Sequence, residues 1–258
     1  MHELPLVFFT VFAQSAIGAF ILLAITALFQ QIGDRQLAIG LFCSMCLFVV
    51  ALTISTFHLG QPLRAFNTLL GTGRSPMSNE IVLAGIFAAC GGIAALGLLL
   101  NRGGRTGFMC LAWLAALAGL LFLVAVTRVY RLSTVPAWSS HYTTAMLLLT
   151  ALIGGGALAA ALGARRLGIY ASLVATLVSL CLRPGYMSML MVTDGGLATA
   201  QLTWFSAQLI LLALGLTVSL VNLRHRPIPG LLAACALVMI TGELAGRIAF
   251  YNLWSIPM

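Results

Sequence analysis

Eight long apolar runs dominate the sequence, and no other feature restricts its fold as strongly. Each run has roughly 17 to 24 residues, enough for a helix to cross a ~30 Å hydrocarbon core. The expected bounds are 6–29, 37–57, 80–100, 107–127, 141–162, 167–187, 203–223 and 229–250. The alternating ten-residue segments of a membrane β-barrel are absent. The pattern predicts an all-α integral membrane protein, a single domain over 1–258 with eight transmembrane helices in two packed bundles.

Charge is scarce in this chain, so each ionisable residue is informative. Only 7% of the residues are charged and 61% are apolar, whereas a soluble domain carries about 25% charged residues. The basic residues are arginines spread thinly between the apolar runs, a distribution typical of topology signals and contacts with the lipid bilayer. A water-soluble globule and a disordered chain are therefore excluded, and no nucleic acid is expected as a partner.

Eight crossings place both termini at one end of the bundle. The turns at the opposite end hold Arg35, Arg102, Arg105, Arg165, Arg166, Arg224 and Arg226. Because these turns are short, their density of positive charge predicts that they are cytoplasmic and that the N- and C-termini are periplasmic. Most of the acids and histidines fall at the terminus end, so any proton-handling chemistry is expected there.

The stretch from His58 to Glu80 carries the largest variety of chemical groups in the chain. Pro62 restricts the backbone that precedes it, Arg64 follows, and Ser78 is a candidate N-cap with Glu80 in the first turn of the third helix. The stretch can bring an imidazole, a guanidinium and a carboxyl to one membrane depth, where the imidazole could accept a proton from a weak acid. The alternative is an interfacial histidine and a glutamate that only stabilises a helix N-terminus.

Two further polar pairs occur near helix ends on the same side of the membrane. Arg128 and Tyr130 end the fourth run, where they could contact a ligand or serve as interfacial anchors. Glu243 and Arg247 are four residues apart in the last run and are predicted to form a structural ion pair.

No metal site and no haem are expected. Cys43 and Cys46 share a helix face, but no neighbouring Cys or His completes a tetrahedral set. A haem needs axial ligands that face each other from different helices, and only His58 and His141 lie near helix ends on one side. The chain is therefore predicted to be haem-free.

Several motifs occur in an order shared with one protein family. They are His2 to Gln14, His58 to Asn67, Ser78 to Glu80, Arg128 to Trp138 and Gly242 to Tyr251. In these motifs the protein resembles the DmsC-type membrane anchor subunits of dimethyl sulfoxide reductase and related molybdoenzymes. A connection expected at 188–202 is shorter than in that family. Anchors of the polysulfide-reductase or NrfD type are similar to these motifs to a lesser degree.

The resemblance implies a haem-free anchor in the bacterial inner membrane that oxidises menaquinol. It also implies two partners, an iron–sulfur electron-transfer subunit and a molybdopterin catalytic subunit. The family associates the positions of His58 and Glu80 with quinol oxidation, and Arg64, Arg128 and Tyr130 are further candidate contacts on the same side. A choice between menaquinol and ubiquinol stays open.

Two other functions compete with quinol oxidation. A polytopic secondary transporter has a similar composition, although no convincing inverted repeat supports it. A passive assembly anchor is the third hypothesis, and it predicts normal partner binding without affinity for a quinol.

Overall fold

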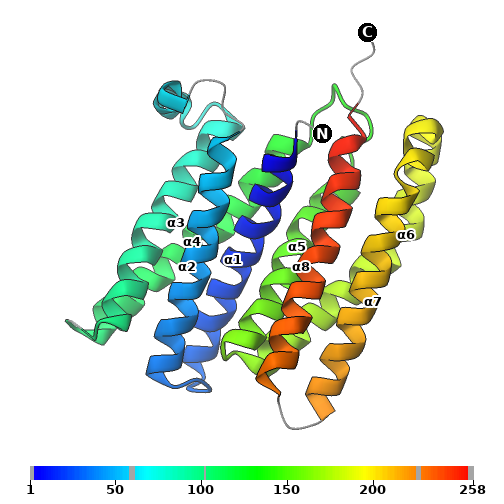
Figure 1. Ribbon diagram of the computed structural model, residues 1–258. Helices are drawn as coiled ribbons and strands as arrows, with labels where there is room; N and C mark the ends of the chain where they lie inside the picture. Colours follow the sequence, from blue (N-terminus) through cyan, green and yellow to red (C-terminus); the bar gives the residue numbers. More distant parts are fainter. Residues whose placement is uncertain (1–2, 58–61, 102, 225–227, 255–258) are drawn as a thin grey trace.

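A computed structural model describes residues 3–57, 62–101, 103–224 and 228–254, with the backbone alone at 62–66 (Figure 1). In this part of the protein the helices are α1 (Leu4–Leu28), α2 (Asp34–Thr56), α3 (Pro76–Leu99), α4 (Arg105–Tyr130), α5 (His141–Leu162), α6 (Arg165–Ala200), α7 (Leu202–Arg224) and α8 (Pro229–Asn252). A 3-10 segment, η1, covers Pro62–Gly71. All eight α-helices are long and apolar enough to cross a membrane, which confirms the predicted fold class.

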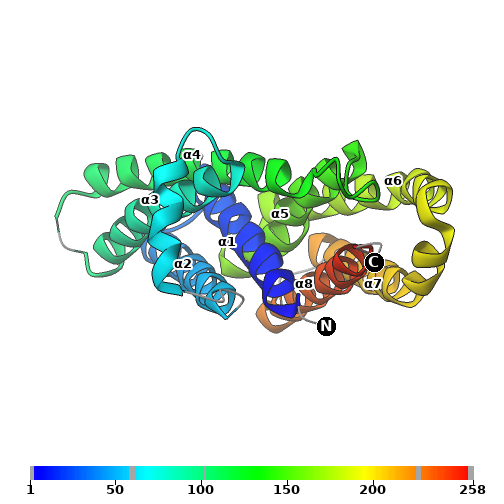
Figure 2. The same ribbon diagram turned by 90° about the horizontal axis from the view of Figure 1, so that it is seen from above.

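The helices form two halves, α1–α4 and α5–α8, that lie side by side when viewed from above (Figure 2). Successive helices run in opposite directions, so α1 begins and α8 ends at the same end of the molecule (Figure 1). The central helix is α1, which contacts α2 and α4 in its own half and α5 and α8 in the other. Segments at the two ends of the sequence therefore meet in the middle of the bundle.

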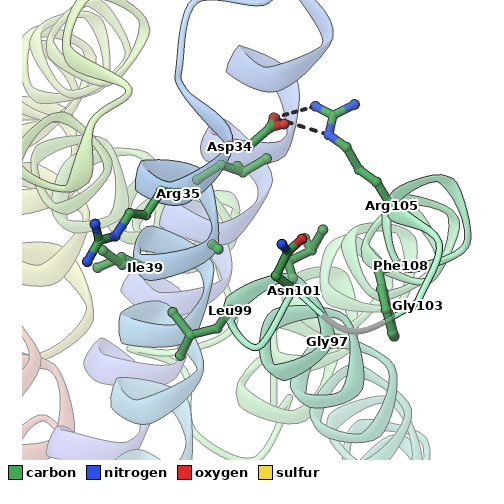
Figure 3. A pocket seen from close by; sticks show the side chains of 12 residues that line it. Asp34, Arg35, Ile39, Gly97, Leu99, Asn101, Gly103, Arg105 and Phe108 are labelled. Carbon is green, nitrogen blue, oxygen red and sulfur yellow. Dashed lines mark hydrogen bonds and ion pairs between the residues drawn. The ribbon is translucent and has the colours of Figure 1, made fainter.

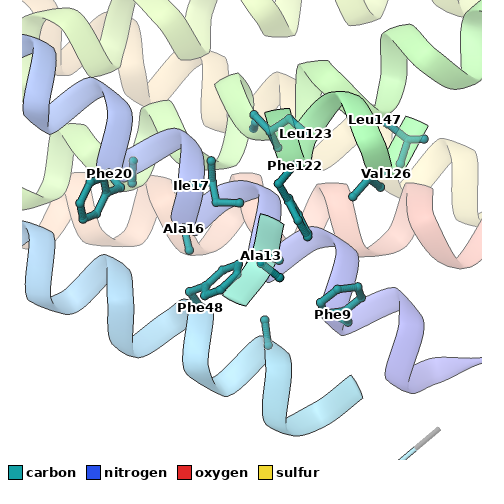
Figure 4. Close-up of a cluster of buried hydrophobic side chains, with 14 of the residues drawn as sticks. Phe9, Ala13, Ala16, Ile17, Phe20, Phe48, Phe122, Leu123, Val126 and Leu147 are labelled. Atoms are coloured by element: carbon teal, nitrogen blue, oxygen red, sulfur yellow. The ribbon is translucent and has the colours of Figure 1, made fainter. Parts of the chain in front are cut away.

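Edge-to-face aromatic rings hold the first half together. The Phe48 ring lies 4.7 Å from the Phe87 ring and 6.1 Å from the Phe122 ring, measured between centroids. Phe20 adds a contact with Phe87 at 5.3 Å. These side chains are fully buried, and Figure 4 shows Phe48 and Phe122 beside α1, with Phe20 further along that helix. Lipid tails are as apolar as these side chains, so the hydrophobic effect does not drive helices together in a bilayer. Helix association there depends on close packing such as these ring contacts.

Glycines allow α1 and α5 to approach each other closely, which joins the two halves. A Cβ atom on Gly18 would overlap the backbone carbonyl oxygen of Ala151. A Cβ atom on Gly155 would lie 2.8 Å from backbone atoms of α1. Small residues at such positions are the usual means by which helix backbones pack in lipid.

Substitution Gly18→Ala is expected to destabilise the protein by about 1–3 kcal/mol, because the added methyl group forces α1 away from α5. The thermal unfolding midpoint of the purified protein in detergent measures this effect. Gly85→Ala is the matched control, since a Cβ atom there meets nothing within 4 Å. An unchanged midpoint for Gly18→Ala would show that the two backbones do not approach this closely.

The sixth helix is longer than predicted. The sequence predicts an end near 187, before a connection over 188–202, but α6 continues to Ala200 with a kink at Asp194. Pro184 lies inside the helix, and the following turns stay helical because Tyr186 and Leu190 are buried against the core. After the kink, the Asp194 carboxylate accepts a hydrogen bond from the Leu197 backbone N–H at 3.0 Å. Packing thus overrides the local breaking signal.

Candidate functional site

The structure divides the predicted quinol-binding residues into separate groups. His58 lies outside the described residues, and so does the side chain of Arg64. Glu80 and Tyr130 are brought together in the interior of the first half. Arg128 is exposed and lines a different surface. Residues from two distant stretches of the sequence therefore share one site, while the neighbouring Arg128 does not.

The position of Glu80 in α3 differs from the one expected. The helix begins at Pro76, four residues before the predicted start at 80, with Ser75 as its N-cap and no acid in its first turn. Proline is favoured at this first position because it lacks the N–H that would be unpaired there. Glu80 therefore belongs to the second turn, and neither the predicted Ser78 cap nor a capping role for Glu80 is observed.

The Glu80 side chain is buried inside a membrane-spanning helix. Only 7% of the residue is exposed, and it makes no hydrogen bond to the described residues. It lies within electrostatic range of the hydroxyl groups of Tyr130 and Tyr251. A buried carboxylate without a hydrogen-bond partner is costly in lipid, so such a residue is a candidate for proton chemistry or ligand binding.

An aromatic cluster built from α4, the following loop and the end of α8 includes the two tyrosines near this carboxyl. The Tyr130 ring lies 5.5 Å from Tyr251 and 6.0 Å from Trp138, and Trp138 stacks on Phe250 at 4.9 Å. The indole N–H of Trp138 donates to the Phe250 carbonyl at 2.9 Å. All four rings are buried. Tyr130 is thus an interior residue and does not serve as an interfacial anchor.

Tyr251 connects this cluster to an open cavity. Its hydroxyl is buried, makes no hydrogen bond of standard geometry with the described residues, and lies close to Thr10 and Tyr130. A cavity of about 430 Å³ opens beside it, lined by residues that include Glu3, Gln201 and Trp254. This volume falls within the range of small-molecule sites. The cavity therefore meets the cluster at Tyr251, whereas Glu80 and Tyr130 are not among its lining residues.

Arg128 borders a second hollow on the outer face of the first half. A groove of about 350 Å³ runs between α3 and α4 below η1, and its lining includes Thr72, Asn79, Leu83 and Arg128. Its walls are largely apolar with a cation at the upper end. Such a groove is accessible from the bilayer, which makes Arg128 a surface contact.

Glu243 and Arg247 lie in one buried hydrogen-bond network, but they are not in direct contact. The Thr150 hydroxyl donates to Glu243 Oε2 at 2.5 Å and accepts from an Arg247 Nη atom at 2.9 Å. Arg247 also donates to Gln14 Oε1 at 3.0 Å. Within the described residues, the direct ion pair is Arg105 with Asp34. The predicted pair therefore takes the form of a bridge, because a threonine of α5 lies between the two charges.

The network extends into the second half through Gln208 of α7. Its amide nitrogen donates to Glu243 Oε1 at 3.2 Å, and its oxygen accepts a hydrogen bond from Arg183 of α6. Arg183 also lies over the rings of Tyr186 and Phe205, at 5.8 and 5.1 Å from their centroids. The Glu243 carboxylate is thus linked through Gln208 and Thr150 to two buried guanidinium groups. Together these residues form a polar core that connects α1, α5, α6, α7 and α8.

Sequence reasoning gave no functional role to Arg183. It also gave no role to Thr150 and Gln208. The available signal was their polarity inside long apolar runs, which in a membrane protein indicates contact with the bundle interior. What the sequence does not show is which of these residues meet.

Metal ligands do not gather in the part of the protein that the structure describes. No group of three or more His, Cys, Asp or Glu residues there could hold a metal ion.

Eight membrane-spanning helices, with buried polar groups near the end where α1 begins, define a polytopic membrane subunit. The protein belongs to the family of DMSO reductase anchor subunits (DmsC), whose model matches residues 1–253. It is therefore a multi-pass membrane anchor of a DMSO reductase complex, and this implies partnership with catalytic and iron–sulfur subunits.

Individual relatives agree with this assignment. The YnfH subunit of anaerobic dimethyl sulfoxide reductase from Escherichia coli (strain K12) is 32% identical, over 98% of this protein and 95% of its own length. The C subunit of anaerobic dimethyl sulfoxide reductase from the same organism is also 32% identical, with the same coverage of both sequences. The corresponding C subunit from Haemophilus influenzae is 36% identical, over 63% of this protein and 59% of its own length.

Proposed function

We propose that this protein oxidises menaquinol at the end of the membrane where α1 begins and α8 ends. The electrons of the menaquinol pass to an iron–sulfur subunit docked on that end, and from there to a molybdopterin catalytic subunit. We further propose that this end is the periplasmic face of the bacterial inner membrane. Membership of the anchor family supports an electron-transfer role, and the short arginine-rich turns at the other end support the orientation.

The observation that carries the proposal is the burial of Glu80 among tyrosine hydroxyls. A carboxyl that stabilised only its own helix would lie in the first turn, and Glu80 does not. A carboxyl with a purely structural role would have hydrogen-bond partners, as Glu243 does. Glu80 has none among the described residues. It is therefore available for a group that enters from outside the protein.

Quinol oxidation releases two electrons and two protons, and the protein must accept both protons. His58 hydrogen-bonds one quinol hydroxyl and takes its proton as the first electron leaves. Glu80 accepts the second proton and relays it to the outer aqueous face. Tyr130 donates to a ring oxygen, and Arg64 orients the ring. The product is the quinone, and both electrons go to the cluster of the docked subunit.

Substitution His58→Arg is expected to lower quinol-dependent reduction of dimethyl sulfoxide at least tenfold, because a guanidinium cannot act as the proton acceptor. The measurement uses membranes that contain the complete complex, with a menaquinol analogue as donor. A reduced dye that delivers electrons directly to the catalytic subunit should give unchanged activity, which shows that the complex has assembled.

His141→Arg is the matched control, since His141 is an exposed histidine at the start of α5 on the same side. Quinol-dependent activity should survive in this variant. Full activity in His58→Arg would contradict the proposal. Extraction of the bound quinone from the purified complex distinguishes menaquinol from ubiquinol. Solute flux through proteoliposomes that contain only this protein would favour the transporter hypothesis.

A further inference from the structure

A cavity lies at the opposite end of the molecule from Glu80. It occupies about 570 Å³ between the start of α2, the end of α3 and the start of α4. Figure 3 shows Arg35 and Arg105 on two sides of Leu99 and Asn101. None of its lining residues belongs to the site proposed for quinol oxidation.

The rim of this cavity is positively charged. Arg105 donates through Nε and an Nη atom to Asp34 Oδ1, at 3.1 and 2.8 Å. Arg35 is exposed and makes no hydrogen bond or ion pair with the described residues. The rim thus carries two guanidinium groups and one carboxylate, which leaves it with a net positive charge.

Two helix N-termini add to the positive potential of the rim. Both α2 and α4 begin at the cavity, after Gly33 and Gly104, and neither has a side-chain cap. Their first backbone N–H groups lack intrahelical partners, and the helix dipoles favour an anion at this position. Two arginines and the N-termini of two helices therefore border one opening.

The lower wall of the cavity is apolar and continues onto the lipid-facing surface. Ile39 is 42% exposed and Leu99 is 37% exposed, and both line the cavity. The ring of Phe108 forms another part of the wall, where it packs over Gly97, at which any Cβ atom would overlap it. Gly103, at a φ of +90°, permits the turn above. A cationic rim above apolar walls matches the two parts of a phospholipid.

We propose that this cavity binds an anionic phospholipid. Its phosphate lies between Arg35 and Arg105, and its acyl chains follow Leu99 and Ile39 into the bilayer. Charge complementarity supports this occupant, because a net positive rim attracts an anionic headgroup more strongly than a zwitterionic one. The location at the end of three membrane-spanning helices places the phosphate at headgroup depth.

Titration of the delipidated full-length protein with phosphatidylglycerol in detergent, followed by native mass spectrometry, tests the proposal. Arg35→Gln is expected to weaken binding about fivefold, the effect of one cation near an anionic lipid. Arg166→Gln is the matched control, because Arg166 is also an exposed second residue of a helix at the same end, outside the cavity. Binding by that variant should equal that of the unsubstituted protein.

Substitution Asp34→Asn should change binding in the opposite direction. It removes the carboxylate that occupies Arg105, so phosphatidylglycerol is expected to bind about fivefold more tightly. This gain is a readout that loss of folding cannot produce. An unchanged or weaker affinity in Asp34→Asn would overturn the proposed position of the phosphate.

Three further results would also overturn the proposal. Equal losses in Arg35→Gln and Arg166→Gln would indicate diffuse attraction to basic turns. Equal binding of phosphatidylcholine would indicate an apolar groove without headgroup recognition. Displacement of phosphatidylglycerol by millimolar inorganic phosphate would indicate a site for free anions. Phosphatidylglycerol binding that resists phosphate and depends on Arg35 is the result expected.

Discussion

Replacing Glu80 by Gln is expected to lower the turnover of quinol oxidation about 100-fold, with the complex still assembled. General acid–base groups contribute at least this factor when they accept a proton in the rate-limiting step. Glutamine has nearly the same shape as glutamate but cannot accept the proton. Because Glu80 makes no hydrogen bond to the described residues, the substitution removes no structural contact, and folding should be preserved.

Steady-state kinetics with a menaquinol analogue measure this effect in membranes that contain the complete complex. Asp194→Asn is the matched control, since Asp194 is an exposed acid near the end of α6. That helix ends on the side of the molecule where α1 begins (Figure 1). The asparagine can still accept the hydrogen bond from Leu197. Wild-type kinetics in Glu80→Gln would show that the buried carboxyl has no part in proton transfer, even if His58 proves essential.

Substitution Glu243→Ala is expected to destabilise the protein by about 3–5 kcal/mol. Glu243 is the carboxylate of the polar network that contains Arg183 and Arg247, and all three residues are buried. Removing it leaves two guanidinium groups without a counter-charge in a low-dielectric interior, which is the costly way to break a buried pair. It also leaves Thr150 without its short acceptor.

Denaturant titration in mixed detergent micelles measures the free energy of unfolding. Glu3→Ala is the control, because Glu3 precedes α1 and makes no capping hydrogen bond to it. Glu243→Gln keeps an acceptor for Thr150 and should lose less stability than the alanine variant. The double variant Glu243→Ala with Arg247→Met should lose less than the sum of the single losses, because it also removes a stranded cation. Additive losses would show that the two charges do not interact.

The number and order of the helices could be predicted from hydrophobic runs, because a segment in lipid must satisfy its backbone hydrogen bonds internally. The end of α6 could not, since Pro184 and Gly185 are local breaking signals and the buried Tyr186 is a tertiary fact. The start of α3 at Pro76 was also missed. That error concealed the position of Glu80 in the second turn.

The site was only partly predictable for a similar reason. The importance of Glu80 and of Glu243 followed from the rarity of acids in apolar runs. Their different surroundings did not follow, because Glu243 has partners on α5 and α7 while Glu80 faces tyrosines of α4 and α8. Spacing along one helix suggested a direct pair with Arg247, and a side chain from another helix lies between them.

Scarce charge and eight apolar runs by themselves determine that this is an all-α membrane protein. In lipid only helices and closed barrels satisfy the backbone, and the alternating segments of a barrel are absent from the sequence. The motif order further indicates its family. The tertiary structure alone decides which rare polar groups meet, since glycines 18 and 155 set the approach of α1 to α5. That approach joins Gln14, Thr150 and Arg247 in one network. Glu80, on α3, has no hydrogen-bond partner among the described residues, and for this reason we propose that it contacts a ligand.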